Sequence, residues 1–113
     1  MVNDSYVPSR GDIVHLTFGP VRGHEQRGRR PAVVLTSRKY NELVGLAFVC
    51  PITSKIKGYP FEVPVVVKGK PSVVLCDHLR SLAWRDRNIS YVMALEIGLV
   101  REVITKVGLL LTS

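Results

Sequence analysis

The alternation of apolar and polar side chains predicts several short strands along most of the chain. From Ile13 to Phe18 the residues are Ile, Val, His, Leu, Thr and Phe, a period of about two that is typical of a half-buried strand. Ala32–Thr36 is a continuous, largely β-branched run, which indicates a central strand. Further strands are predicted at Leu46–Ile52, Phe61–Val67, Ser72–Cys76 and Ile89–Met93.

The period of the pattern changes near the C-terminus. Apolar residues recur there at intervals of three and four, the stripe of an amphipathic helix, at Val100, Val103, Ile104, Val107, Leu110 and Leu111. Glu96 near the start of this stripe and Lys106 near its end suit the helix dipole. Two polar segments between strands remain, and we expect Ser37–Glu42 to be a turn or short helix and Asp77–Leu82 to be irregular.

About five to seven short strands followed by one helix predict a mainly β fold of the α+β class. Such a set forms a small, strongly bent sheet or a partly open barrel, because curling reduces the number of exposed strand edges. The terminal helix is expected to cover one open side. With 113 residues the chain is expected to form one domain over residues 1–113.

The charge of the chain indicates an acidic partner. A formal net charge of +7 suits nucleic acid, an anionic membrane surface or an acidic protein. No apolar run reaches the roughly 18 residues that a bilayer-spanning helix needs. The first residues also lack the basic and then apolar pattern of a secretory signal, so a cytoplasmic location without membrane contact is expected.

The segment Phe18–Leu35 concentrates this charge. It carries four arginines, Arg22, Arg27, Arg29 and Arg30, in a glycine-containing loop that ends in an apolar strand. Like charges at close range repel, so such crowding is favoured where an anion neutralises it, and phosphate is the usual anion. The alternative interpretation is a solvated basic loop with no ligand.

The cysteines and histidines indicate no metal site. Cys50 and Cys76 lie in apolar runs, which predicts buried and unreactive thiols. The spacing of zinc sites is missing, and the three histidines are far apart in the sequence.

Three polar clusters fall at strand ends or in loops, at Gly23–Arg30, Thr53–Lys57 and Asp77–Arg87. A curled sheet can bring such strand ends together on one face. They would then combine a carboxylate, a guanidinium, a hydroxyl and several cations. RNA supplies its own nucleophile, the 2′-hydroxyl, so these groups could cleave it without metal or cofactor.

Three segments of the chain match a known family, namely GDIVHLTFGPVRGHEQRGRRPAVVLT, VCPITSKIKGYPFEV and VVLCDHLRSLAWRDR. They cover the chain from about Tyr6 to Arg87, in register, with several motifs in order. On these motifs the chain resembles the MazF/PemK family of bacterial toxin endoribonucleases.

The resemblance implies an SH3-like, curled β-barrel of the CcdB/PemK type with a C-terminal helix, working as a homodimer. It also implies sequence-specific cleavage of single-stranded RNA such as mRNA, without metal or cofactor, which arrests translation and growth. The products would be a 2′,3′-cyclic phosphate and a 5′-hydroxyl. A cognate antitoxin with an acidic, extended C-terminal tail would inhibit the toxin by occupying the RNA site.

The resemblance also implies roles for individual residues. Arg30 and Thr53 match the catalytic arginine and hydroxyl residue of the family, and Glu25 matches a glutamate with an acid–base or positioning role. Asp77 matches a carboxylate that one branch uses as base, together with an arginine two residues earlier. This chain has Leu75 at that earlier position, so we prefer a mechanism with Arg30 and Thr53.

RNA binding is predicted for a further set of residues around these positions. Phe18 and Arg80 fall where the family contacts bases and backbone. The complete predicted set is Phe18, His24, Gln26, Arg29, Ser54, Lys57, Asp77, Arg80 and Arg85.

Each of these residues also has a structural interpretation. Arg30 could pair with Glu25, Thr53 could satisfy backbone groups, and Asp77 could cap the segment after it. Trp84 is expected in the core or as a dimer anchor, and Tyr59 as a packing residue.

Two other functions remain open at this stage. One is a non-catalytic toxin that binds DNA gyrase, as the related CcdB toxins do. The other is a plain basic module that binds RNA without cleaving it.

Overall fold

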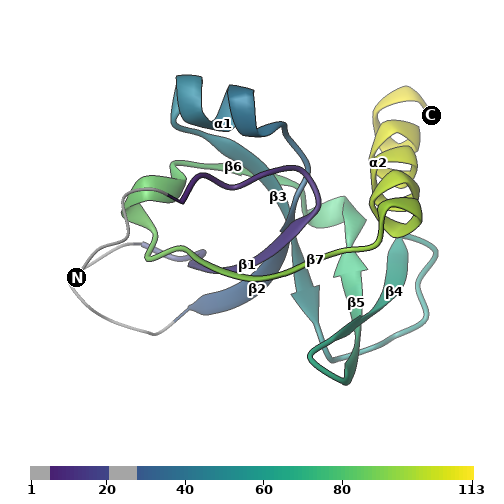
Figure 1. The fold of residues 1–113 in the computed structure, drawn as a ribbon. Coiled ribbons are helices and arrows are strands. Elements are labelled where there is room, and N and C mark those ends of the chain that lie inside the picture. The colour runs from purple at the N-terminus through teal and green to yellow at the C-terminus, as the bar shows by residue number, and fades with distance from the viewer. Residues whose placement is uncertain (1–5, 21–27) are drawn as a thin grey trace.

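The computed structural model describes residues 6–20 and 28–113 of the chain. Its strands are β1 (Asp12–Thr17), β2 (Arg29–Val34), β3 (Ala47–Thr53), β4 (Glu62–Val67), β5 (Lys70–Leu75), β6 (Arg80–Leu82) and β7 (Ser90–Ala94). The helices are α1 (Arg38–Val44) and α2 (Ile97–Thr112), with short 3-10 turns η1 (Cys76–His78) and η2 (Trp84–Asp86). Figure 1 shows these strands curling into an open half-barrel, with α2 standing beside β4 and β5. The predicted curled, mainly β fold with a terminal helix is therefore confirmed.

All paired strands run antiparallel, in the order β4-β5-β3-β2-β1-β7. β3 is the strand on which the sheet bends. One of its edges pairs with β2, while the other pairs first with β6 and then, at Ile52 and Thr53, with β5. The interruption between β6 and β5 is η1, which lies against β3. Because β3 changes partners along its length, its end at Thr53 is turned toward β5.

Two groups of buried apolar side chains line the two faces of the central strands. One group joins Ile13, Val33 and Ile52 to Val100 and Val103 of α2, so the helix covers that face. The other group is centred on Leu16, Ala32, Val34, Val49 and Trp84. The helix predicted for the C-terminal segment is thus present, and Val100 and Val103 of its stripe face the sheet. Ile104, Leu110 and Leu111 of the predicted stripe are exposed, so the apolar stripe is covered only in its first half.

The ends of α2 and α1 follow local capping chemistry. Glu96 is the N-cap of α2, and its carboxylate accepts hydrogen bonds from the backbone N–H groups of Gly98 and Leu99. At the C-terminal end of α1, Gly45 takes a left-handed φ of 78°. A Cβ atom there would lie 3.2 Å from Nη1 of Arg85, a flexible side-chain end that can shift, so it is the left-handed φ that favours glycine at this position.

Some predicted elements need correction. β2 begins at Arg29, earlier than predicted, which places Arg29 and Arg30 in a strand. The segment predicted as irregular contains η1 and β6, because Arg80–Leu82 finds a partner edge on β3. Tyr59 was predicted to pack but is 60% exposed, because the turn around it projects from the sheet. Trp84 is buried in the core at 3% exposure, in agreement with one of its two predicted roles.

None of the helices within residues 6–20 and 28–113 has the length and apolar character needed to cross a membrane.

Candidate active site

The sheet register brings Arg30 and Thr53 together. β2 and β3 form an antiparallel ladder in which Ala32 pairs with Pro51. Continuing this register by two residues places Arg30 opposite Thr53, and opposite residues of an antiparallel pair project to the same face. Both side chains reach the surface, since Arg30 is exposed and Thr53 is half-buried. A guanidinium and a hydroxyl that are 23 positions apart in the sequence thus become neighbours.

Two hollows meet at this pair of residues. The larger, of about 620 Å³, extends toward β5 and β7, and its further lining includes His15, Lys68, Lys70 and Tyr91. The smaller, of about 420 Å³, extends toward β6 and is lined by Phe18, His78 and Arg80, among others. Arg30, Ile52 and Thr53 line both hollows, so the guanidinium and hydroxyl lie where the two join.

Cations surround both hollows. Lys68 and Lys70 lie at the hairpin between β4 and β5, on the rim of the larger hollow. In the smaller hollow, the guanidinium carbon of Arg80 lies 5.6 Å from the centroid of the Phe18 ring, a cation–π contact. An extended polyanion crossing from one hollow to the other would pass Arg30 at the midpoint.

Thr53 has a defined local contact. Its Oγ1 accepts a hydrogen bond of 3.1 Å from the backbone N–H of Lys55, which fixes the turn after β3. This is the structural role that the sequence offered as an alternative, and it leaves the hydroxyl proton able to donate to a ligand. Ser54, the next residue, lines the larger hollow.

The turn after Thr53 is braced by a buried carboxylate. Glu62 is 7% exposed and accepts hydrogen bonds from the backbone N–H groups of Lys57 and Gly58. The main chain of Lys57 is therefore held, while its ammonium extends outward to 5.9 Å from the Tyr59 ring. The Lys57 side chain lines neither hollow.

His15 is the one histidine that lines the larger hollow. It projects from β1, where it pairs with Pro31, next to Arg30. Burial, and then the positive charge of Arg29, lower the pKa of His15 below its ordinary value of 6.5. The imidazole is consequently neutral at pH 7, with one nitrogen able to donate a hydrogen bond and the other able to accept one.

The structure gathers five of the predicted site residues around the two hollows, namely Phe18, Arg30, Thr53, Ser54 and Arg80. It places four others outside the linings, namely Arg29, Lys57, Asp77 and Arg85. His24, Glu25 and Gln26 lie outside the described residues. Arg22 and Arg27 of the basic loop also lie outside them.

Asp77 is exposed in η1, with Oδ1 3.8 Å from Nε2 of His78. The turn has Leu75 as its N-cap, and no side chain caps it, so the capping role suggested for Asp77 is not seen.

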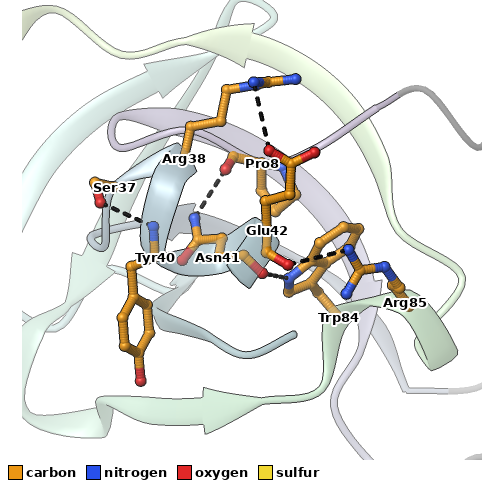
Figure 2. A network of polar contacts seen from close by, with 8 residues as sticks. All are labelled: Pro8, Ser37, Arg38, Tyr40, Asn41, Glu42, Trp84 and Arg85. Atoms are coloured by element: carbon orange, nitrogen blue, oxygen red, sulfur yellow. Dashed lines mark hydrogen bonds and ion pairs between the residues drawn. The ribbon is translucent and has the colours of Figure 1, made fainter. Parts of the chain in front are cut away.

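Arg85 belongs to a polar network on the side of α1 (Figure 2). Its guanidinium carbon lies 4.3 Å from the centroid of Trp84, and its Nη2 donates to the carbonyl of Glu42 at 3.4 Å. Trp84 Nε1 in turn donates to the carbonyl of Asn41 at 3.0 Å. The stacking and the hydrogen bond hold the Arg85 guanidinium against α1.

Asn41 is the centre of this network and is completely buried. Its Nδ2 donates to the carbonyls of Pro8 and Thr36, at 2.8 and 3.1 Å, and its Oδ1 accepts from the Thr36 hydroxyl. Throughout the described residues, no buried side-chain nitrogen or oxygen lacks a hydrogen-bond partner. The network therefore joins the N-terminal segment, α1 and η2 at low energetic cost.

Several residues of the hollows were not predicted as site residues, namely His15, Lys68, Lys70, His78 and Tyr91. Lys68 and Lys70 belong to a short basic turn, and this charge was the one signal in the sequence that could have found them. His15 and Tyr91 looked like ordinary strand positions. Only the pairing of β1 with both β2 and β7 shows that they face the same hollow.

The two cysteines are buried and free, as predicted. Burial is the main cause that raises the pKa of the Cys50 thiol to about 12 and that of Cys76 to about 11. Thiols in this state are poor nucleophiles at neutral pH. Within residues 6–20 and 28–113, no three side chains of His, Cys, Asp or Glu converge in a way that could hold a metal ion.

Comparison with known proteins places this geometry in a family context. Residues 9–111 match the family model described as PemK-like, MazF-like toxin of type II toxin–antitoxin system. The chain is 45% identical to the endoribonuclease toxin MazF of Escherichia coli K12 over 82 residues, 73% of this chain and 74% of that protein.

Solved structures agree with this comparison. MazF of Deinococcus radiodurans superposes with a TM-score of 0.85 at 47% identity, covering 96% of this chain and all (100%) of that one. A MazE–MazF structure from the same organism gives a TM-score of 0.83 at 43% identity, again covering 96% and 100% of the two chains.

Proposed function

The chain belongs to the family of PemK-like, MazF-like toxins of type II toxin–antitoxin systems, and from this premise we propose that it is an endoribonuclease toxin. Its substrate is single-stranded RNA, mRNA included, cut within a short sequence in the cytoplasm. Relatives in Escherichia coli carry the name endoribonuclease, which supports this assignment. The match over residues 9–111 also supports one toxin domain over residues 1–113.

The observation that carries the proposal is that Arg30 and Thr53 both line both hollows, at the point where the hollows join. A scissile phosphate at this junction would have one nucleotide directed into each hollow. Arg30 can donate two parallel hydrogen bonds to the non-bridging phosphoryl oxygens. The Thr53 hydroxyl can add a further donor from the opposite strand.

The chemistry is an intramolecular transesterification. The 2′-oxygen of the RNA gives its proton to a general base and forms a bond to phosphorus. The bond from phosphorus to the 5′-oxygen breaks, and a general acid gives a proton to this leaving oxygen, so that no net proton is consumed. The products are a 2′,3′-cyclic phosphate and a 5′-hydroxyl. Arg30 and Thr53 act by stabilising the negative charge that grows on the phosphoryl oxygens in the transition state.

The reaction needs neither metal nor cofactor in this proposal, because the nucleophile is part of the substrate and arginine supplies the positive charge. Glu25 keeps its predicted acid–base or positioning role. Phe18, Ser54 and Arg80 bind nucleotides in the hollows, since each lines one of them. His24, Gln26, Arg29, Lys57, Asp77 and Arg85 remain predicted RNA contacts.

A cognate antitoxin inhibits the toxin in this proposal. The Deinococcus radiodurans relative has been crystallised as a MazE–MazF complex, which supports a partner of this kind. An acidic, extended tail of the antitoxin would occupy the cationic hollows in place of RNA, because both are chains of negative charge.

The toxin works as a homodimer in this proposal. The C-terminal end of α2 exposes large apolar side chains, with Leu109 at 54% and Leu111 at 76%, and symmetric pairing is the commonest way to bury such a surface. Sedimentation at micromolar concentration should give twice the mass of the chain, and a monomer would contradict this part of the proposal.

The test is cleavage of a long single-stranded RNA by the purified chain in excess EDTA, with cut sites mapped by primer extension. We expect a few sites that share a short sequence, and 5′-hydroxyl ends that accept phosphate from a polynucleotide kinase. Absence of cleavage, or dependence on added divalent metal, would overturn the proposal or its metal-free part. A uniform ladder would contradict sequence specificity.

The gyrase-binding alternative receives no support from the reported relatives, which are named endoribonucleases. A DNA supercoiling assay with gyrase should be unaffected by the protein.

A further inference from the structure

Residues Thr17–Gly19 and Gly28–Arg29 are fastened to one short segment of chain, residues 87–90. We call Thr17–Gly19 together with Gly28 and Arg29 the neck. Arg87 lies across the first half of the neck, and its Nη1 donates to the carbonyls of Thr17, Phe18 and Gly19 at 3.2, 3.1 and 3.0 Å. Arg87 is half-buried, and because its Nη1 carries two N–H groups, at least one of them is shared between two of these three consecutive carbonyls.

Backbone contacts complete this attachment. The N–H of Thr17 donates to the carbonyl of Arg87 at 2.8 Å, and the N–H of Phe18 donates to the carbonyl of Gly28 at 3.0 Å. Gly28 has a left-handed φ of 79°, which lets the chain turn back to close the neck.

In the second half of the neck the donor belongs to the neck itself, and the acceptors lie in residues 87–90. Arg29 reaches outward, and its Nε donates to the carbonyl of Asn88 at 3.2 Å while its Nη2 donates to the Ser90 hydroxyl. Asn88 has a left-handed φ of 54°, which is uncommon for a residue other than glycine. The carbonyl that accepts from Arg29 therefore belongs to a tight turn. Arg29 and Arg87 thus form a clasp between the neck and residues 87–90.

The clasp adjoins two residues of the proposed site. Phe18, whose carbonyl Arg87 holds, lines the smaller hollow beneath Arg80. Arg30 directly follows Arg29 in β2 and lies where the hollows join. A small tilt of the neck would therefore change the position of the Phe18 ring relative to the Arg30 guanidinium.

We propose that Arg87 is a positioning residue that sets Phe18 in the smaller hollow and thereby determines which RNA sequence is cut. This inference rests on the proposed ribonuclease function. Arg87 touches no substrate in it and acts entirely through the carbonyl groups of the neck. Loss of Arg87 should therefore reduce selectivity between RNA sequences more than it reduces the stability of the fold.

The test compares Arg87→Met and Arg87→Lys with the unchanged protein. The substrates are two short RNA oligonucleotides, one with the mapped cleavage sequence and one with a single base changed. The measured quantity is the ratio of kcat/KM for the two. We expect Arg87→Met to lower this ratio of kcat/KM values roughly tenfold, because the variant loses charged hydrogen bonds to the carbonyls of the neck. Arg87→Lys keeps the charge but is shorter, so it should restore part of the ratio.

Arg10→Met is the matched control. Arg10 donates from Nε to the carbonyl of Leu35 at 2.8 Å, so its loss removes the same charge and the same kind of bond away from the neck. The control should keep the ratio of the unchanged protein. An unchanged ratio in folded Arg87→Met, or an equal fall in Arg10→Met, would overturn the proposal.

Amide hydrogen exchange gives a second measurement that needs no cleavage. In Arg87→Met the amides of Thr17 and Phe18 should exchange roughly tenfold faster, while core amides such as that of Val33 keep their rates. If Arg87→Met does not fold, the same measurement on Arg87→Lys decides, with a smaller acceleration expected and unchanged rates counting against the clasp. If the unchanged protein cleaves no RNA, the proposed function fails, and the exchange rates still report whether Arg87 holds the neck.

Discussion

The corner formed by α1 and Trp84 differs sharply from the face that carries Arg30 and Thr53, although both gather polar groups at the ends of strands. At the corner, Asn41 is completely buried, and all its side-chain hydrogen-bonding atoms have partners in neighbouring segments. On the Arg30–Thr53 face, the cations are exposed and line hollows. Polar groups that hydrogen-bond to each other stabilise the fold, whereas exposed cations around a hollow attract anionic ligands.

Removing the guanidinium of Arg30 should give the largest effect. Arg30→Ala is expected to lower kcat for RNA cleavage by about 10²–10³-fold, because a donor to the transition-state charge is lost. The free energy of unfolding should change by less than about 0.5 kcal/mol, since the side chain is exposed. Cleavage rates and urea denaturation check the two halves. Persistent cleavage would remove Arg30 from the mechanism.

Asn41→Ala should have the reverse profile. The carbonyls of buried Pro8 and half-buried Thr36 lose their donor, which is expected to cost about 3 kcal/mol of unfolding free energy. The activity per folded molecule should stay near that of the unchanged protein. Lys39→Ala, on the exposed side of the same helix, is the control and should change stability by less than about 0.5 kcal/mol. A neutral Asn41→Ala would show that the corner does not stabilise the fold.

Thr53→Val and Thr53→Ser together separate the hydroxyl of Thr53 from its shape. Valine keeps the β-branched shape but removes Oγ1, the acceptor for the N–H of Lys55. We expect Thr53→Val to lower kcat about tenfold or more, because one donor to the transition state is missing. The free energy of unfolding should fall by about 1 kcal/mol, because the hydrogen bond from Lys55 is lost. Thr53→Ser should retain most activity, and equal rates for the two variants would contradict a role for the hydroxyl.

Trp84→Phe should weaken the corner by a smaller amount than Asn41→Ala. The variant keeps an aromatic ring in the core but removes the Nε1 donor to the carbonyl of Asn41. A loss of about 1–2 kcal/mol in unfolding free energy is expected. If the loss equals that of Asn41→Ala, the ring and not the hydrogen bond supplies the stability.

The smallest expected effect is a pH dependence from His15. Its pKa in the folded protein lies below 6.5, so the unfolded chain takes up a proton first as the pH falls. Stability should therefore decline on acidification below about pH 6.5 and level off once the folded pKa is passed. His15→Gln should reduce this decline in urea denaturation at pH 7.5 and 5.5. An identical decline in both proteins would assign it to other groups.

Local patterns predicted the elements because local forces build them. The three-and-four spacing around Val103 identified a real helix, but of its stripe only Val100 and Val103 are buried, while Ile104, Leu110 and Leu111 are exposed. The alternation around Val14 identified a real strand, but β1 is buried on both faces, since Ile13 and Val14 are both 0% exposed. The candidate site could be predicted only in part. The motifs indicated Arg30 and Thr53, and the packing of β2 beside β3 then placed both residues in the lining of the two hollows.

Arg85 and Arg87 show where sequence analysis ends. They are two residues apart, and the sequence analysis placed both in the same polar cluster, Asp77–Arg87. In the structure Arg85 stacks on Trp84 beside α1, while Arg87 holds the neck of the basic loop. Nothing in the segment WRDR distinguishes them, because their partners lie at Glu42 and Phe18, far away along the chain.

The sequence by itself determined the strands, the terminal helix, the positive charge and the motifs that indicate a toxin ribonuclease. These depend on side-chain periodicity and composition, which are local properties. The tertiary structure alone decided which arginines face the hollows and which hold the fold. It did so through strand register and the bend of β3, because a shift of one residue in pairing turns every side chain to the opposite face.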